Sequence, residues 1–419
     1  MDAAAPWPMM RIPTEFRYWE NRDKPWAQKR ARLVRILFRC DPWLPDATVR
    51  TWASTYYDAD PVAEAFIDEV YMTQGQQAGR AMLDTALEQG VNSVANAPES
   101  LLRLFDEVER DPDWVDRRLV ERGAKVFRNW RSHLYSNAGA ITLHGYRENS
   151  VAKPLVFTGA YAGKNTNSRF LETAQFWHDV SQPGGLDRGG IGIRTALRVR
   201  MMHVFVRRRL LDHPDWDLDA WGVPISQGDA LLTLMGGSFI PGYMLRLLGH
   251  INTRDDILAT MHFWRYVGHV MGVQPRWYPE SIEDAARLML ASEIKSINGS
   301  GDDGKWLVQS YVKSYAPKGE EPLPERARKW FEYLLQRGYV GLFIPPATQR
   351  QFELPPAGLT PLLPLAQTPF VLARESMRRV VPLLDRWLDR QSVRANERWL
   401  RQRLGERKAQ YTAVETFTR

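Results

Sequence analysis

The segment from Arg194 to Leu211 (RTALRVRMMHVFVRRRLL) has the apolar pattern of a packed helix and carries a single histidine. His203 lies three residues after Arg200 and four residues before Arg207. On a helix with 3.6 residues per turn these three side chains share one face. The sequence therefore predicts a helix that presents one imidazole between two guanidinium groups.

Such a face suits a flat, apolar cofactor with two negative charges, of which haem is an example. The imidazole of His203 would bind the iron, and Arg200 and Arg207 would bind the propionates. A lone histidine on an apolar helix is, however, more often a core residue whose hydrogen bonds are satisfied. Both interpretations stay open on the residues alone.

A second set of polar residues lies upstream, in the helical stretch Ser168–Trp177. Arg169 and Thr173 are four residues apart, and Glu172 falls on the same helical face. The glycine-rich stretch Pro183–Gly192 then forms a predicted turn before the histidine-bearing helix. The order is therefore a polar helix, a turn and an imidazole-bearing helix.

In order and spacing these motifs resemble the latex-clearing, or rubber oxygenase, family and its fungal relatives of mycophenolic-acid biosynthesis. The resemblance spans residues 120 to 300. It rests on five segments of this chain: Arg169-x-x-Glu172-Thr173, the glycine-rich turn, Arg200-x-x-His203-x-x-x-Arg207, Pro224–Asp229 and His262–Gly268.

The resemblance implies an all-α fold, with a globin-like helical core around a b-type haem. The family's proximal histidine would fall on His203, flanked by Arg200 and Arg207. Its distal arginine and threonine would fall on Arg169 and Thr173. Rubber-cleaving members carry a distal lysine where this chain has Glu172, which is therefore the candidate acid–base group.

Rubber-cleaving members also use a glutamate as a base upstream of the distal arginine. An ungapped count places Lys153 and Pro154 at that position, and Glu148 fits only with an insertion. These two differences from the rubber-cleaving members concern the identity of the substrate and of the catalytic base. They bear less on haem binding.

Length and composition fit a large helical protein, with 419 residues, 44% of them hydrophobic and 16 of them tryptophan. We expect a helical N-terminal extension over residues 1–99, a haem-binding core over 100–300 and a helical C-terminal extension over 301–419. Pro345–Pro369 is a proline-rich linker within the last part, and 298–304 a shorter linker before it. A break in the C-terminal helix is expected at Pro382.

Other features narrow the function. Cys40 is the only cysteine, so the chain has no intrachain disulfide and no cysteine-held metal cluster. No apolar run approaches the ~18 residues of a membrane span, and the N-terminus lacks a secretory pattern, so we expect a cytoplasmic protein. The net charge of +7 is spread along helices without a nucleic-acid-binding module.

Several shorter patterns have simpler explanations. Gly299–Lys305 matches most of a phosphate-binding loop, but Trp306 stands where Ser or Thr would bind magnesium. No Gly-x-Ser-x-Gly elbow is present, which disfavours acyl-transfer hydrolysis. His262 and His269 are expected to line a core or a pocket rather than bind a metal. For His178 and Asp179 a capping or surface role is favoured over a distal acid–base pair.

The arginine-rich segment Leu372–Gln410 interleaves tryptophan and leucine with arginine. Such a segment either packs its apolar residues on the core or lies on an anionic membrane surface as a peripheral contact. We favour the packing interpretation, and the membrane interpretation stays open.

Two classes of function remain. The first is a haem b-dependent oxygenase that uses dioxygen on a hydrophobic, unsaturated substrate such as an isoprenoid or another lipid. Dioxygenase-type cleavage of a C=C bond is one reaction open to this class. The second is a haem-binding sensor or carrier without oxygenase turnover. A cofactor-free helical interaction protein is a third class, and the absence of a Soret band would reveal it.

Overall fold

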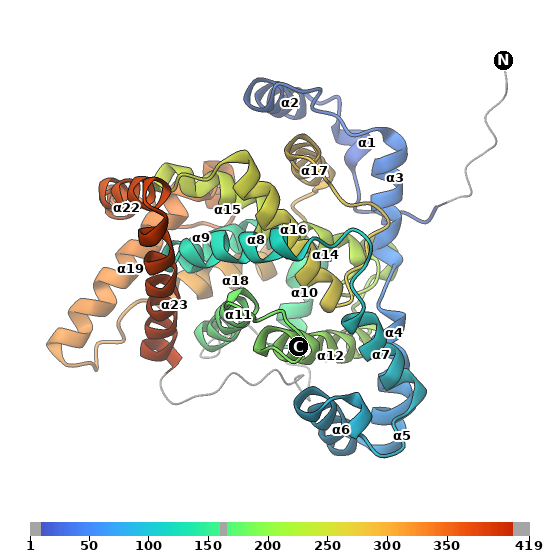
Figure 1. The fold of residues 1–419 in the computed structure, drawn as a ribbon. Coiled ribbons are helices and arrows are strands. Elements are labelled where there is room, and N and C mark those ends of the chain that lie inside the picture. The colour runs from blue at the N-terminus through green and yellow to red at the C-terminus, as the bar shows by residue number, and fades with distance from the viewer. Residues whose placement is uncertain (1–9, 160–165, 405–419) are drawn as a thin grey trace.

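The computed structural model describes residues 10–159 and 166–404, and within these ranges every regular element is a helix. The all-α fold class is therefore confirmed. Figure 1 shows short N-terminal helices along one side, central helices packed together, and the C-terminal helices on the opposite side.

The N-terminal part consists of short helices. They are α1 (Tyr18–Asn21), α2 (Pro25–Phe38), α3 (Asp46–Ser54), η1 (Thr55–Tyr57), α4 (Pro61–Phe66), the π-helical turn η2 (Ile67–Tyr71), α5 (Met72–Gln74), α6 (Gln76–Gln89), η3 (Val91–Ser93) and α7 (Glu99–Glu109).

The central part contains longer helices. They are α8 (Arg117–Asn129), α9 (Ser132–Gly145), α10 (Asn149–Phe157), α11 (Thr166–Ser181), α12 (Ile191–Leu211), α13 (Leu218–Trp221), α14 (Gln227–Gly237), α15 (Phe239–Met244), η5 (Leu245–Leu248), α16 (Arg254–Val270) and α17 (Ile282–Lys295).

The C-terminal part adds α18 (Gly301–Ser314), α19 (Leu323–Phe343), α20 (Pro346–Gln351), α21 (Leu362–Leu365), α22 (Thr368–Val380) and α23 (Pro382–Leu404). The predicted break at Pro382 is confirmed, since α23 begins there. The end of the predicted C-terminal helix, residues 405–410, lies outside the described residues. The predicted linker over 298–304 is partly wrong, because α18 already begins at Gly301.

Helices α8 and α16 form the closest pair in the centre of the molecule. Gly123 makes this approach possible, because a Cβ there would lie 2.1 Å from the carbonyl oxygen of Ala259. The hydrophobic core around this pair is continuous from Phe16 to Leu400. The core therefore includes residues from both sides of the predicted boundaries near residues 100 and 300. The division into three parts stays a prediction.

The C-terminal helices hold the corner between α8 and α9. Lys125 pairs with Asp385, and Arg128 binds Asp389 through Nε at 2.8 Å. Arg131, whose φ of 54° marks the corner, donates to the carbonyl oxygen of Gln391 at 3.1 Å. The C-terminal extension is thus part of the support of the central helices.

The turn between α11 and α12 brings those helices into contact. The amide of Gly192 donates to the carbonyl oxygen of Gly185 at 2.8 Å. A Cβ on Gly185 would lie 2.4 Å from the carbonyl oxygen of Asp179, and one on Gly192 would lie 2.7 Å from Cα of Val180. The turn needs glycine because backbone fills the space where side chains would be.

We expect Gly192→Ala to lower the free energy of unfolding by ~1–3 kcal/mol, since the added methyl group would displace backbone. Chemical denaturation measures the change. Gly236→Ala is the matched control, because a Cβ on Gly236 meets no atom within 4 Å and alanine favours the helix. Equal effects of the two substitutions would show that the turn is not tightly packed.

Candidate active site

The imidazole of His203 is neutral and has no hydrogen-bond partner among the described residues. Its neighbours Met201 and Val204 are buried, but His203 itself keeps part of its surface accessible. Burial, and after it the charge of Arg207, lower the pKa of His203 to about 4, while Asp60 acts in the opposite direction. At neutral pH a ring nitrogen is therefore free to bind a metal.

Apolar side chains surround His203 on α12. Met202, Phe205 and Val206 are only partly buried, although they pack against the hydrophobic core. The ring of Tyr71, from the π-helical turn η2, meets the ring of Phe205 edge-on with centroids 5.0 Å apart. The imidazole is thus in the kind of apolar environment that a porphyrin ring requires.

Arg200 is buried and bound by two carboxylates. Its Nε and Nη2 donate to the two carboxylate oxygens of Asp60 at 2.7 and 2.8 Å. Nη2 also lies 2.8 Å from Oε1 of Glu107. This ion triad links α12 to α7 and to the residue that caps α4.

Arg207 is likewise buried and bound within the protein. It donates to Oε1 of Glu64 at 3.0 Å and to the carbonyl oxygens of Pro224 and Ile225 at 3.0 and 2.9 Å. Ile225 has a positive φ of 53°, so the loop before α14 turns its carbonyl groups towards this guanidinium. Binding of cofactor propionates by Arg200 and Arg207 stays a prediction.

The polar residues of α11 form a connected group. Nη1 of Arg169 donates to Oε2 of Glu172 at 2.8 Å, so the predicted shared face of these two residues is confirmed. The hydroxyl of Thr173 donates to the carbonyl oxygen of Arg169 at 3.2 Å. All three side chains are partly accessible. The side chains of residues 166–168 and the whole of 160–165 lie outside the description.

The pair His178–Asp179 holds the end of α11. Asp179 accepts from the hydroxyl of Thr195 at 2.8 Å and from the amide of Gln175 at 2.7 Å, which joins α11 to the start of α12. His178 is buried and contacts the amide of Gln182. These contacts agree with the structural role favoured from the sequence.

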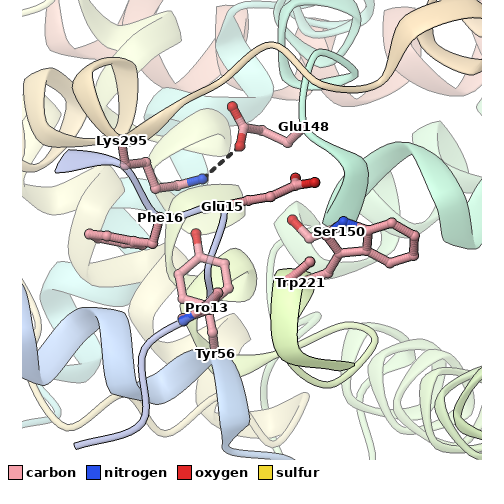
Figure 2. Close-up of a pocket in the computed structure, with 9 residues that line it drawn as sticks. Pro13, Glu15, Phe16, Tyr56, Glu148, Ser150, Trp221 and Lys295 are labelled. Atoms are coloured by element: carbon pink, nitrogen blue, oxygen red, sulfur yellow. Dashed lines mark hydrogen bonds and ion pairs between the residues drawn. The ribbon is translucent and has the colours of Figure 1, made fainter. Parts of the chain in front are cut away.

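Glu148 lies in a small recess built by distant segments (Figure 2). Its Oε2 accepts from the buried ammonium group of Lys295 at 2.8 Å. Burial acts to raise the pKa of Glu148, but Lys295 outweighs it and the pKa is lowered. Glu148 is therefore a fixed anion with little basicity. Sequence reasoning missed Lys295, Tyr56 and Trp221 in this recess, since no spacing connects them.

Among the described residues no group of three or more His, Cys, Asp or Glu side chains could hold a metal ion. Nε2 of His262 accepts from the amide of Asp116 at 3.0 Å, and Nε2 of His269 lies 3.0 Å from the carbonyl oxygen of Glu107. Both rings also lie edge-on to Trp114. These two histidines therefore pack and bind backbone.

Part of the C-terminal segment is buried, as the packing interpretation requires. The ring of Trp399 stacks on Tyr135 with centroids 4.4 Å apart, and Leu400 is buried. Trp387 is exposed. The second half of α23 is thus part of the core and is not free to lie on another surface.

A family of oxygenases matches most of the chain. Residues 124–418 match the family described as "ER-bound oxygenase mpaB/B'/Rubber oxygenase, catalytic domain". The chain belongs to this family. The match begins within α8 and includes α11, α12 and the C-terminal helices, so it covers His203 and the polar residues of α11 but not Asp60, Glu64 or Glu107. The resemblance found in the sequence is therefore confirmed.

Comparisons with individual proteins agree with this family match. The chain is 27% identical over 260 residues to a protein named rubber oxygenase from Streptomyces sp. (strain K30), which covers 60% of this chain and 61% of the relative. The match thus spans less than two thirds of that relative. The fold is similar to the latex clearing protein in its closed state, with a TM-score of 0.58 and 20% identity over 82% of this chain and 90% of the other.

One described segment corrects the expectation that no apolar stretch reaches the length of a membrane span. Gln227–Leu248 is long and apolar enough by length and composition alone. It is half buried and divided into α14, α15 and η5, and it packs on α16 and α9. This segment is weak evidence for a membrane span, because a helix in a protein core can have the same length and hydropathy.

We expect the stability of the protein to fall as the pH decreases from about 6.5 to about 4. Burial lowers the pKa of His178 to about 4, so the unfolded chain binds a proton in this window that the folded chain does not. The contribution is complete above pH 6.5 and is lost towards pH 4. His178→Gln should make the curve of unfolding free energy against pH flatter by ~1–3 kcal/mol. Identical curves for the two proteins would contradict the burial of a neutral imidazole.

Proposed function

We propose that the protein is a haem b-dependent oxygenase that acts with dioxygen on a hydrophobic, unsaturated substrate of the isoprenoid or lipid type. The observation that carries the proposal is the neutral, unpartnered imidazole of His203 on a helix that packs against the one bearing Arg169 and Glu172. Membership of an oxygenase family supports the reaction type. The name of the Streptomyces relative, rubber oxygenase, supports an apolar alkene as substrate.

The residues around His203 fit a haem on one side. The imidazole of His203 would hold the haem iron, and Met202, Phe205 and Val206 would offer apolar contacts to the macrocycle. A bound haem would supply the redox chemistry that activates dioxygen, and the protein would supply the ligand, the polar groups and the apolar environment.

In this proposal Arg200 and Arg207 position His203. Arg200 fixes α12 against Asp60 and Glu107, and Arg207 fixes it against Glu64 and the loop before α14. To bind cofactor carboxylates, these guanidinium groups would have to leave their protein partners. Asp60 would then be a buried carboxylate without an ion-pair partner, which is unfavourable. Their proposed role is therefore to set the position and the neutral state of the imidazole.

Arg169, Glu172 and Thr173 form the proposed catalytic group. Arg169 uses one N–H group on Glu172, and a guanidinium carries five donors, so others can bind an oxygen atom of a substrate. Glu172 is held in place by that ion pair and is the proposed group that accepts or returns a proton. Thr173 is fixed against the backbone of the same turn.

The second candidate is a haem-binding sensor or carrier without turnover. The observation that favours it is the ion pair that engages Glu172 with Arg169, at the position where the rubber-cleaving enzymes have lysine. Oxygen uptake by the haem-loaded protein with an unsaturated isoprenoid lipid separates the two candidates, and the saturated analogue is the control. We also propose that the protein acts in the cytoplasm, a reducing compartment that suits its free Cys40.

We expect the purified protein to show a Soret band, and His203→Ala to lower haem occupancy at least ~10-fold because the axial ligand is lost. Absorption spectra after haem titration measure this. His262→Ala is the matched control, since His262 binds only backbone at the surface of α16. Full occupancy and an unchanged spectrum in His203→Ala would reject the ligand assignment.

We expect Glu172→Gln to keep haem binding and to change the pH profile of oxygen uptake, because the titrating group is removed. Glu172→Lys, which introduces the residue of the rubber-cleaving relatives, should change the absorption spectrum of the haem-loaded protein, because an amine at this position could bind the iron. Arg337→Gln, on α19, serves as a control for a change of surface charge. If neither Glu172 substitution changes the oxygen uptake or the absorption spectrum, Glu172 has only a structural role as the partner of Arg169.

A further inference from the structure

Helix α2 carries an exposed apolar ridge. The exposed fractions are 55% for Leu33, 62% for Ile36 and 64% for Leu37. Ile36 and Leu37 lie three and four residues after Leu33, so the three side chains share one face of the helix, and Trp26 begins the same face. Figure 1 places α2 at the edge of the molecule. It lies outside the matched region 124–418.

The opposite side of α2 is fixed on the protein. Ala27 and Ala31 are buried, and α2 packs against α17. Arg30 reinforces this contact through an ion pair with Glu293 at 2.7 Å. Because small side chains face α17, the helix lies close to the protein and its larger apolar side chains stay outside.

The ridge is accompanied by positive charge that the protein does not neutralise. From Lys24 to Arg39 the sequence contains six basic residues and no acidic one. Lys29 lies on the ridge, and Arg32 and Arg35 lie on its flank. None of these three has an ion-pair partner among the described residues. A surface that covers the ridge must therefore be both apolar and anionic.

We propose that α2 docks on the surface of a membrane that contains anionic lipids. An amphipathic helix with cations beside its apolar side binds in the plane of such a surface, with its aliphatic side chains among the acyl chains. The proposal rests on α2 alone and holds whether or not the proposed oxygenase function is correct. If both are correct, docking brings the protein to the phase in which lipid-like substrates dissolve.

Other occupants fit less well. A second copy of the protein would bring two strongly basic helices together, and like charges oppose that contact. The C-terminal helices also expose apolar side chains, but acidic residues lie among their arginines. Glu375 pairs with Arg378, and Asp385 and Asp389 pair with Lys125 and Arg128 of α8.

Sedimentation of the full-length protein with vesicles tests the proposal. Vesicles of phosphatidylcholine alone are compared with vesicles that also contain phosphatidylserine. We expect binding to the anionic vesicles, at least ~10-fold weaker binding to the neutral ones, and loss of binding at high salt. Leu33→Gln/Ile36→Gln/Leu37→Gln and, separately, Lys29→Gln/Arg32→Gln/Arg35→Gln should each reduce binding to anionic vesicles at least ~10-fold.

Matched variants on the C-terminal helices control for loss of surface hydrophobicity and charge. Leu359→Gln/Leu362→Gln/Leu383→Gln removes three side chains of similar exposure, and Arg386→Gln/Arg390→Gln/Arg394→Gln removes three exposed arginines. Both should bind like the unchanged protein. Circular dichroism and thermal melting confirm that each variant is folded.

A dye on the single cysteine of Leu37→Cys/Cys40→Ser gives a second readout, since its emission should shift to the blue only on anionic vesicles. The proposal is overturned if the unchanged protein fails to bind, if the α2 variants bind normally, or if only the C-terminal variants lose binding. Concentration-dependent dimerisation that is abolished by the α2 variants, without vesicle binding, would assign the ridge to a second copy.

Discussion

The ion triad of Arg200, Asp60 and Glu107 is the interaction on which the position of α12 depends. Arg200 is almost fully buried, and two carboxylates from outside the central helices neutralise it. Removing either acid would leave a buried charge without its partner, which typically costs several kcal/mol. The N-terminal helices α4 and α7 are therefore structural parts of the site, although the family match begins only at residue 124.

The helix pair α11–α12 depends on a second constraint, the close approach of backbone in the glycine-rich turn. Thr195 and Asp179 join the two helices beside that turn, and α23 packs against α11 from the other side. Together with the contacts of Arg128 and Arg131 to α23, this makes the site the product of three sequence regions. The hydrophobic core likewise contains residues from all three of these sequence regions.

Patterns within one helix or one turn could be predicted from the sequence, and contacts between distant segments could not. The 3.6-residue period predicts α12 and the shared face of Arg169 and Glu172, and proline predicts the break at Pro382. Periodicity also places Arg200 and Arg207 beside His203. It cannot show that Asp60, Glu64 and Glu107 bind these arginines, because the pairs are separated by about a hundred residues in sequence and no spacing rule connects them.

The acids that bind Arg200 and Arg207 change the electrostatic field at His203. A histidine between two unpaired arginines would face a strongly positive field, which suits anionic groups of a ligand. With Arg200 neutralised by two acids and Arg207 by one, the remaining effects on the pKa of His203 are burial first and the charge of Arg207 second. Both keep the imidazole neutral without requiring a ligand anion. The site is thus prepared to donate a nitrogen lone pair from an apolar face, and the arginines contribute by holding α12 rigidly against its neighbours.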